Sequence, residues 1–118
     1  MDITPEQANA IRKECNEHIQ RKQLLDRLNQ NPDFQALTKF YLEEEPARLA
    51  QLYGEPSINL GEKRELHRAE IQERLMGIAR FAEFLRGIHM LASQAQKQIQ
   101  DLDKAENEAV QNAEVVGE

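Results

Sequence analysis

The sequence predicts an all-α protein: a helical hairpin or three-helix arrangement with one long C-terminal helix and coiled-coil-like packing. Apolar residues recur at spacings of three and four along most of the chain. Prolines and glycines are few, and most of them stand between these periodic stretches. Tryptophan is absent and aromatic residues make up only 5% of the 118 positions, which favours a helical bundle over a β-sandwich. We expect one helical domain at residues 1–105 and an acidic tail at 106–118.

The longest periodic stretch predicts a helix at residues 60–105. From Glu62 to Ala105 it contains no proline, and at about 1.5 Å per residue it would span roughly 66 Å. Its apolar stripe lies on one helical face, at Ile71, Leu75, Ile78, Phe81, Leu85, Ile88, Ala92, Ala95, Ile99 and Leu102. Gly77 and Gly87 lie either at a tolerant surface or where another helix comes close, and Gly87 is alternatively a helix end. Such a helix is longer than one small domain can cover, so part of its stripe is expected to bind another chain.

Helix-start signals place the first helix at residues 5–29. Thr4 can cap it, Pro5 suits the first helical position, and Gln7 completes a capping box. Cys15 lies on its apolar face, where a buried small hydrophobic side chain is expected and not a reactive thiolate.

A second helix is expected at residues 32–53, after an Asn31 cap. Pro46 interrupts it, because proline inside a helix removes a hydrogen bond and clashes with the preceding turn at a cost of about 3 kcal/mol. We therefore expect a kink near residue 46. The buried face of this helix is expected at Phe34, Leu37, Tyr41 and Leu42. The next loop, residues 55–61, offers a second capping box from Asn59 and Glu62 into the long helix.

Charge is concentrated at the C-terminal end. The net charge is −6, and residues 100–118 contribute −5 through six acidic residues and Lys104. With almost no basic counterpart expected within the chain, this end predicts a partner with a basic surface. The near-neutral remainder does not favour a basic nucleic-acid-binding protein or a polybasic membrane binder. Cys15 is the single cysteine, so no internal disulfide is expected, and neither a secretion signal nor a membrane span is predicted.

Residues with catalytic or metal-binding chemistry do not form a recognisable site. The two histidines of the long stretch, His67 and His89, are too far apart along one helix to share a metal. Cys15 and His18 provide only two of the four ligands that a structural zinc site needs. The sequence contains no phosphate-binding glycine loop and no nucleophile elbow. We therefore expect no enzyme activity, no cofactor and no metal.

Association with other protein subunits is the function that the apolar residues favour. Apolar side chains cover more than one face of the long helix, which is typical of a helix buried on several sides. The expected protein interface consists of Ile78, Phe81, Phe84, Leu85, Ile88, Leu91, Ile99 and Leu102. The alternative is that these residues only form the three-helix core. Nucleic-acid binding is not favoured, because the basic residues at 63–86 alternate with acidic ones and form no segregated basic face.

Residues 31–105 resemble the small helical proteins encoded among the virion and assembly genes of tailed bacteriophages. The residues that carry this resemblance are Asn31-Pro32-Asp33-Phe34, Tyr41-Leu42-Glu43-Glu44-Glu45 with Ala47-Arg48-Leu49, and the long helix with Arg80-Phe81 and Phe84-Leu85 before an acidic end. The resemblance implies a non-enzymatic, multi-copy component that binds portal, capsid or tail proteins, located in the virion or in the host cytoplasm before assembly. Two alternatives stay open: a small inhibitor of a host enzyme whose acidic tail mimics nucleic acid, and a DNA-packaging accessory protein.

Overall fold

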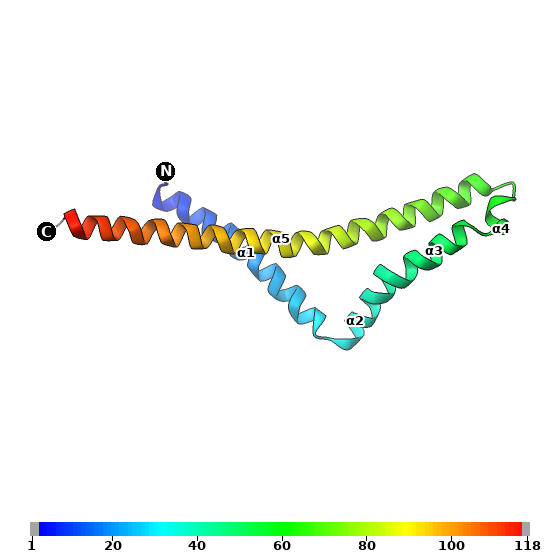
Figure 1. The fold of residues 1–118 in the computed structure, drawn as a ribbon, viewed down its shortest axis with the longest axis horizontal. Coiled ribbons are helices and arrows are strands. Elements are labelled where there is room, and N and C mark those ends of the chain that lie inside the picture. Colours follow the sequence, from blue (N-terminus) through cyan, green and yellow to red (C-terminus); the bar gives the residue numbers. More distant parts are fainter. Residues whose placement is uncertain (1–2, 117–118) are drawn as a thin grey trace. The chain divides into compact units, whose positions relative to one another are not determined.

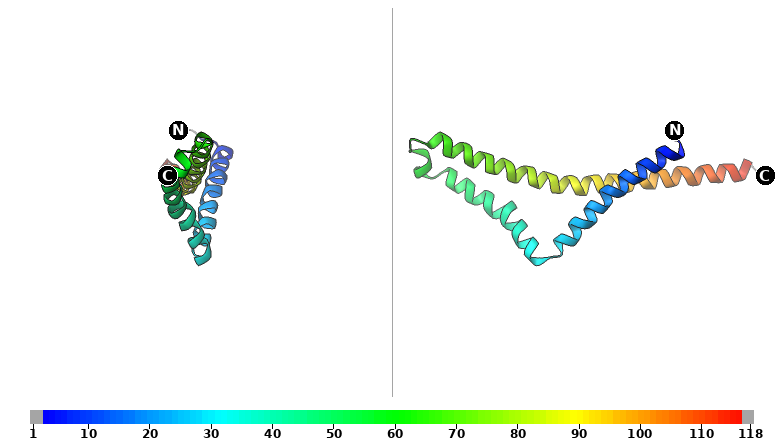
Figure 2. Two further views of the ribbon diagram at one scale, coloured as in Figure 1. Left: turned by 90° about the vertical axis from the view of Figure 1, so that its right-hand side faces the viewer. Right: turned by 180° about the vertical axis from the view of Figure 1, so that it is seen from behind.

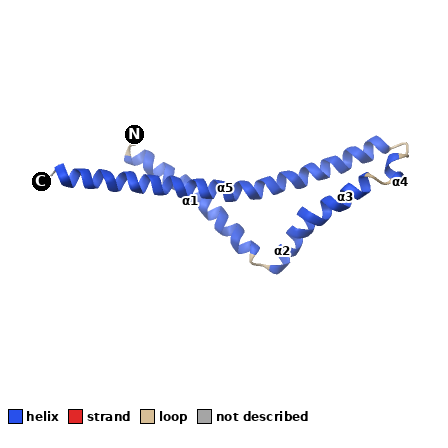
Figure 3. Ribbon diagram, viewed as in Figure 1, coloured by secondary structure: helices blue, strands red, loops and turns tan. Residues whose placement is uncertain are grey.

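The described part of the chain is almost entirely helical. The computed structural model describes residues 3–116, of which no residue lies in a strand, and 91% of the structure is helix (Figure 3). This confirms the predicted all-α class with one long C-terminal helix. In chain order the elements are α1 (Pro5–Asn29), α2 (Pro32–Lys39), the π-helical turn η1 (Phe40–Glu44), α3 (Glu45–Tyr53), α4 (Pro56–Asn59) and α5 (Arg64–Val116) (Figure 1).

The elements group into two compact units that share α5. Unit 1 combines Met1–Leu25 with Gly87–Glu118, and unit 2 is Asp26–Arg86. The sequence predicts one domain at residues 1–105, whereas in the structure each half of α5 has its own partner helices. The length of α5 explains this, because its 53 residues extend beyond what one small core can cover.

Unit 1 is an antiparallel pair formed by α1 and the C-terminal half of α5. Arg12 lies beside Asp103, and Cys15 lies beside Gln98. The residue numbers of the contacting pairs therefore increase along α1 and decrease along α5, so the two helices run in opposite directions (Figure 2). Its buried side chains are mostly small: Ala8, Cys15 and Leu25 from α1, and Ala92 and Ala95 from α5. Small residues at spacings of three, four and seven allow two helices to pack closely, as in a coiled coil.

Unit 2 packs α3 against the N-terminal half of α5. Leu49 of α3 is fully buried and forms the core with Ile71 and Ile78 of α5. The partly buried residues around them are Leu42, Leu52, Tyr53, Ile58 and Leu75. The guanidinium of Arg68 lies 5.0 Å from the centre of the Tyr53 ring, a cation–π contact at the edge of this core.

The first two helix starts follow their capping signals. The Gln7 backbone N–H donates to Thr4 Oγ1 at 3.1 Å, and the Thr4 N–H donates to Gln7 Oε1 at 3.0 Å, which confirms the capping box. Asn31 Oδ1 accepts from the Asp33 N–H at 2.8 Å and from the Phe34 N–H at 3.4 Å. These bonds involve residues no more than three positions apart, so the local sequence predicts them correctly.

The irregularity near Pro46 takes the form of a π-helical turn. Pro46 has no N–H to donate, and its ring would clash with the turn before it in a regular helix. In η1 the Glu45 N–H donates instead to the Phe40 carbonyl, five residues back, and α3 begins at Glu45. The wider turn accommodates the proline by inserting one residue into the helix. The residues before the turn are therefore rotated about the helix axis relative to the residues after it.

The predicted start of the long helix is wrong. The expected loop at 55–61 contains α4, and α5 begins at Arg64 instead of residue 60. Asn59 does not cap α5, because its Nδ2 donates to the carbonyls of Tyr53 at 2.8 Å and Glu55 at 3.0 Å. The side chain therefore satisfies a carbonyl at the end of α3, an acceptor that the end of a helix leaves free.

Neither glycine of α5 ends the helix or allows a close approach. The helix continues through Gly77 and Gly87, and a Cβ atom added at either would meet nothing within 4 Å. The alternatives of a helix end at Gly87 and of close helix packing are therefore wrong: Gly77 is exposed, Gly87 is half-buried, and both have open space beside the backbone. The helix also continues beyond residue 105 to Val116, through most of the expected tail; residues 117–118 lie outside the described residues.

Gly77→Ala is expected to stabilise the protein by about 0.4–1 kcal/mol, because alanine restricts the unfolded chain and fits the open space. Urea unfolding followed by circular dichroism measures this change. Gly54→Ala is the comparison variant, because a Cβ atom at Gly54 would contact the Gln51 carbonyl oxygen at 3.6 Å, whereas a Cβ atom at Gly77 meets open space. A lower midpoint for Gly77→Ala would contradict the assignment of Gly77 to an open surface.

Candidate protein-interaction surface

The structure separates the predicted interface residues into core and surface. Ile78 is buried in the core of unit 2 and is not available to a partner. The side chains of Leu85, Ile88, Ile99 and Leu102 are half-buried. Phe81, Phe84 and Leu91 are exposed, with exposed fractions of 36%, 63% and 40%. The one stripe expected from the sequence is therefore part core and part exposed surface.

Three aromatic side chains of unit 2 form a connected exposed surface. The rings of Tyr41 and Phe81 meet edge to face, with centroids 5.7 Å apart. Phe84 stacks near Phe81 at 6.4 Å. We call Tyr41, Phe81 and Phe84 the aromatic surface. Exposed aromatic groups in mutual contact are typical anchors of protein–protein interfaces.

Leu37 does not lie in the expected buried face of the second helix, whereas Tyr41 does face α5 but remains partly exposed. Leu37 and Tyr41 were expected in the buried face of the second helix, but their exposed fractions are 68% and 39%. Leu42 is half-buried against the core, as the helical pattern predicts. The π-helical turn explains the difference, because the inserted residue shifts the inward-facing positions of α2 relative to those of α3. The proline at residue 46 is the sequence signal that could have revealed this shift.

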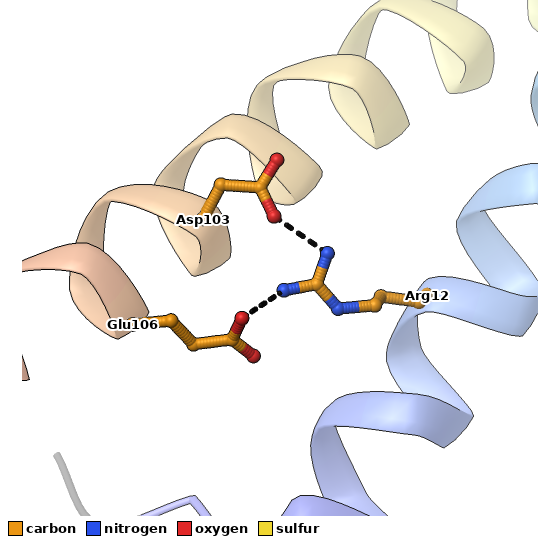
Figure 4. Close-up of polar contacts among 3 residues, drawn as sticks. All are labelled: Arg12, Asp103 and Glu106. Carbon is orange, nitrogen blue, oxygen red and sulfur yellow. Dashed lines mark hydrogen bonds and ion pairs between the residues drawn. The ribbon is translucent and has the colours of Figure 1, made fainter. Parts of the chain in front are cut away.

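The acidic end of α5 has a basic counterpart within the chain. Arg12 of α1 reaches both Asp103 Oδ1, at 2.6 Å from Nη1, and Glu106 Oε2, at 2.9 Å from Nη2 (Figure 4). The hydrogen bonds to Asp103 and then Glu106 raise the pKa of Arg12 above its ordinary value. The expectation of almost no internal partner is therefore wrong at this point. The sequence could not reveal the pairing, because Arg12 and Asp103 are 91 positions apart.

Replacing Arg12 by alanine is expected to cause a small loss of stability that disappears at high salt. The three side chains are solvent-accessible, so dissolved ions screen their attraction. Melting temperatures at low and high ionic strength measure the effect, with Lys13→Ala on the same helix as the control. An equal loss at both salt concentrations would mean that Arg12 acts through packing and not through charge.

A hollow of about 190 Å³ lies beside the single cysteine in unit 1. Cys15, His18, Leu91 and Gln98 are among its lining residues, and the thiol lies 3.4 Å from Gln98 Oε1. Cys15 is buried, in keeping with a small core side chain. Over residues 3–113, no group of three or more His, Cys, Asp or Glu residues is arranged to hold a metal ion.

Comparison with known proteins adds no information on function. No family model, no curated protein and no solved structure matches this chain. The helices of the described part include none that is long and apolar enough to cross a membrane.

Proposed function

We propose that the protein is a non-enzymatic structural or assembly subunit of a bacteriophage virion, associated with the head, portal or tail and present in several copies. In this proposal it binds neighbouring protein subunits through the exposed apolar part of α5. The partner chemistry is an apolar groove or helix face that receives aromatic side chains.

The aromatic surface is the observation that carries this proposal. Phe84 keeps 63% of its surface exposed although it stacks near Phe81, and connected exposed apolar side chains mark protein-interaction sites. The buried residues of unit 2 within the described chain are Leu49, Ile71 and Ile78, so this unit exposes more large apolar side chains than it buries. When another protein covers such a surface and removes it from water, the free energy of the system falls.

The assignment to a phage particle rests on the resemblance of residues 31–105 to virion and assembly proteins. The acidic end gives less support to the alternative of an inhibitor that mimics nucleic acid, because Arg12 neutralises part of its charge. An assembly role does not depend on that charge. It depends on apolar contacts, which are retained when salt screens the ion pairs.

Particle composition tests the proposal. Mass spectrometry of purified particles is expected to detect the chain in several copies per particle, and Phe84→Asp is expected to reduce that copy number sharply. Leu66→Asp is the matched control, because Leu66 lies on the same helix and in the same unit and is also largely exposed. Absence of the chain from the particles, or its recovery bound to a host enzyme, would contradict the assembly role.

A further inference from the structure

We draw no further inference here: the strongest candidate, the exposed aromatic surface of Tyr41, Phe81 and Phe84 on unit 2, belongs to the interaction site already described, and nothing in the described part of the chain shows what covers it.

Discussion

Leu49→Ala is expected to lower the free energy of unfolding by about 2–5 kcal/mol. Leu49 has no exposed surface and forms the core with Ile71 and Ile78, so its truncation leaves a cavity where α3 meets α5. Urea unfolding followed by tyrosine fluorescence measures the loss in the relevant unit, because Tyr41 and Tyr53, the two tyrosines of the chain, both lie in unit 2.

Leu37→Ala provides the matched control for this experiment. The same chemical change at an exposed position of the same unit is expected to alter stability by less than about 0.5 kcal/mol. Equal losses for the two variants would show that Leu49 is not the centre of the core of unit 2.

Ala92→Leu is expected to destabilise the pairing of α1 with α5 by about 1–3 kcal/mol. Ala92 has no exposed surface and belongs to unit 1, so a larger side chain there has to displace its neighbours. Cys15 provides a specific measurement, because it is the only cysteine and is buried in the same unit. Its rate of modification by a thiol reagent is expected to rise in the variant.

Ser93→Leu adds the same side chain at the next residue, which is exposed. It is expected to leave the rate of Cys15 modification close to that of the unmodified protein. If Ala92→Leu also left this rate unchanged, the close packing of small residues in unit 1 would be wrong.

Particular residues show how far the sequence predicts the fold. The capping residues Thr4 and Asn31 mark the starts of α1 and α2 correctly, and the proline-free apolar stripe predicts the long C-terminal helix. Asn59 was assigned to the wrong helix, because its side chain can bond either to following N–H groups or to preceding carbonyls. The sequence contains both options, and only the path of the chain between α3 and α5 selects one of them.

The candidate surface was predicted only in part. Apolar side chains on more than one face of the long helix predict Phe81 and Phe84 as interface residues, and both are exposed. Leu37 is exposed instead of buried, because the π-helical turn changes which face of the helix points inward. Tyr41 faces α5, as the helical pattern predicts, but 39% of its surface stays exposed. Ile78 was included although it is buried, because a helical stripe does not distinguish residues that contact the chain's own core from residues that remain exposed.

The sequence by itself determined the class of the fold, the helix starts at Thr4 and Asn31, and the irregularity near Pro46. These features depend on backbone hydrogen bonds and steric contacts within about five residues, so neighbouring positions contain the necessary information. The tertiary structure alone decided the division into two units, the pairing of Arg12 with Asp103 and Glu106, and the exposure of the aromatic surface. These features depend on which distant segments pack together, and periodic apolar residues are compatible with several such arrangements.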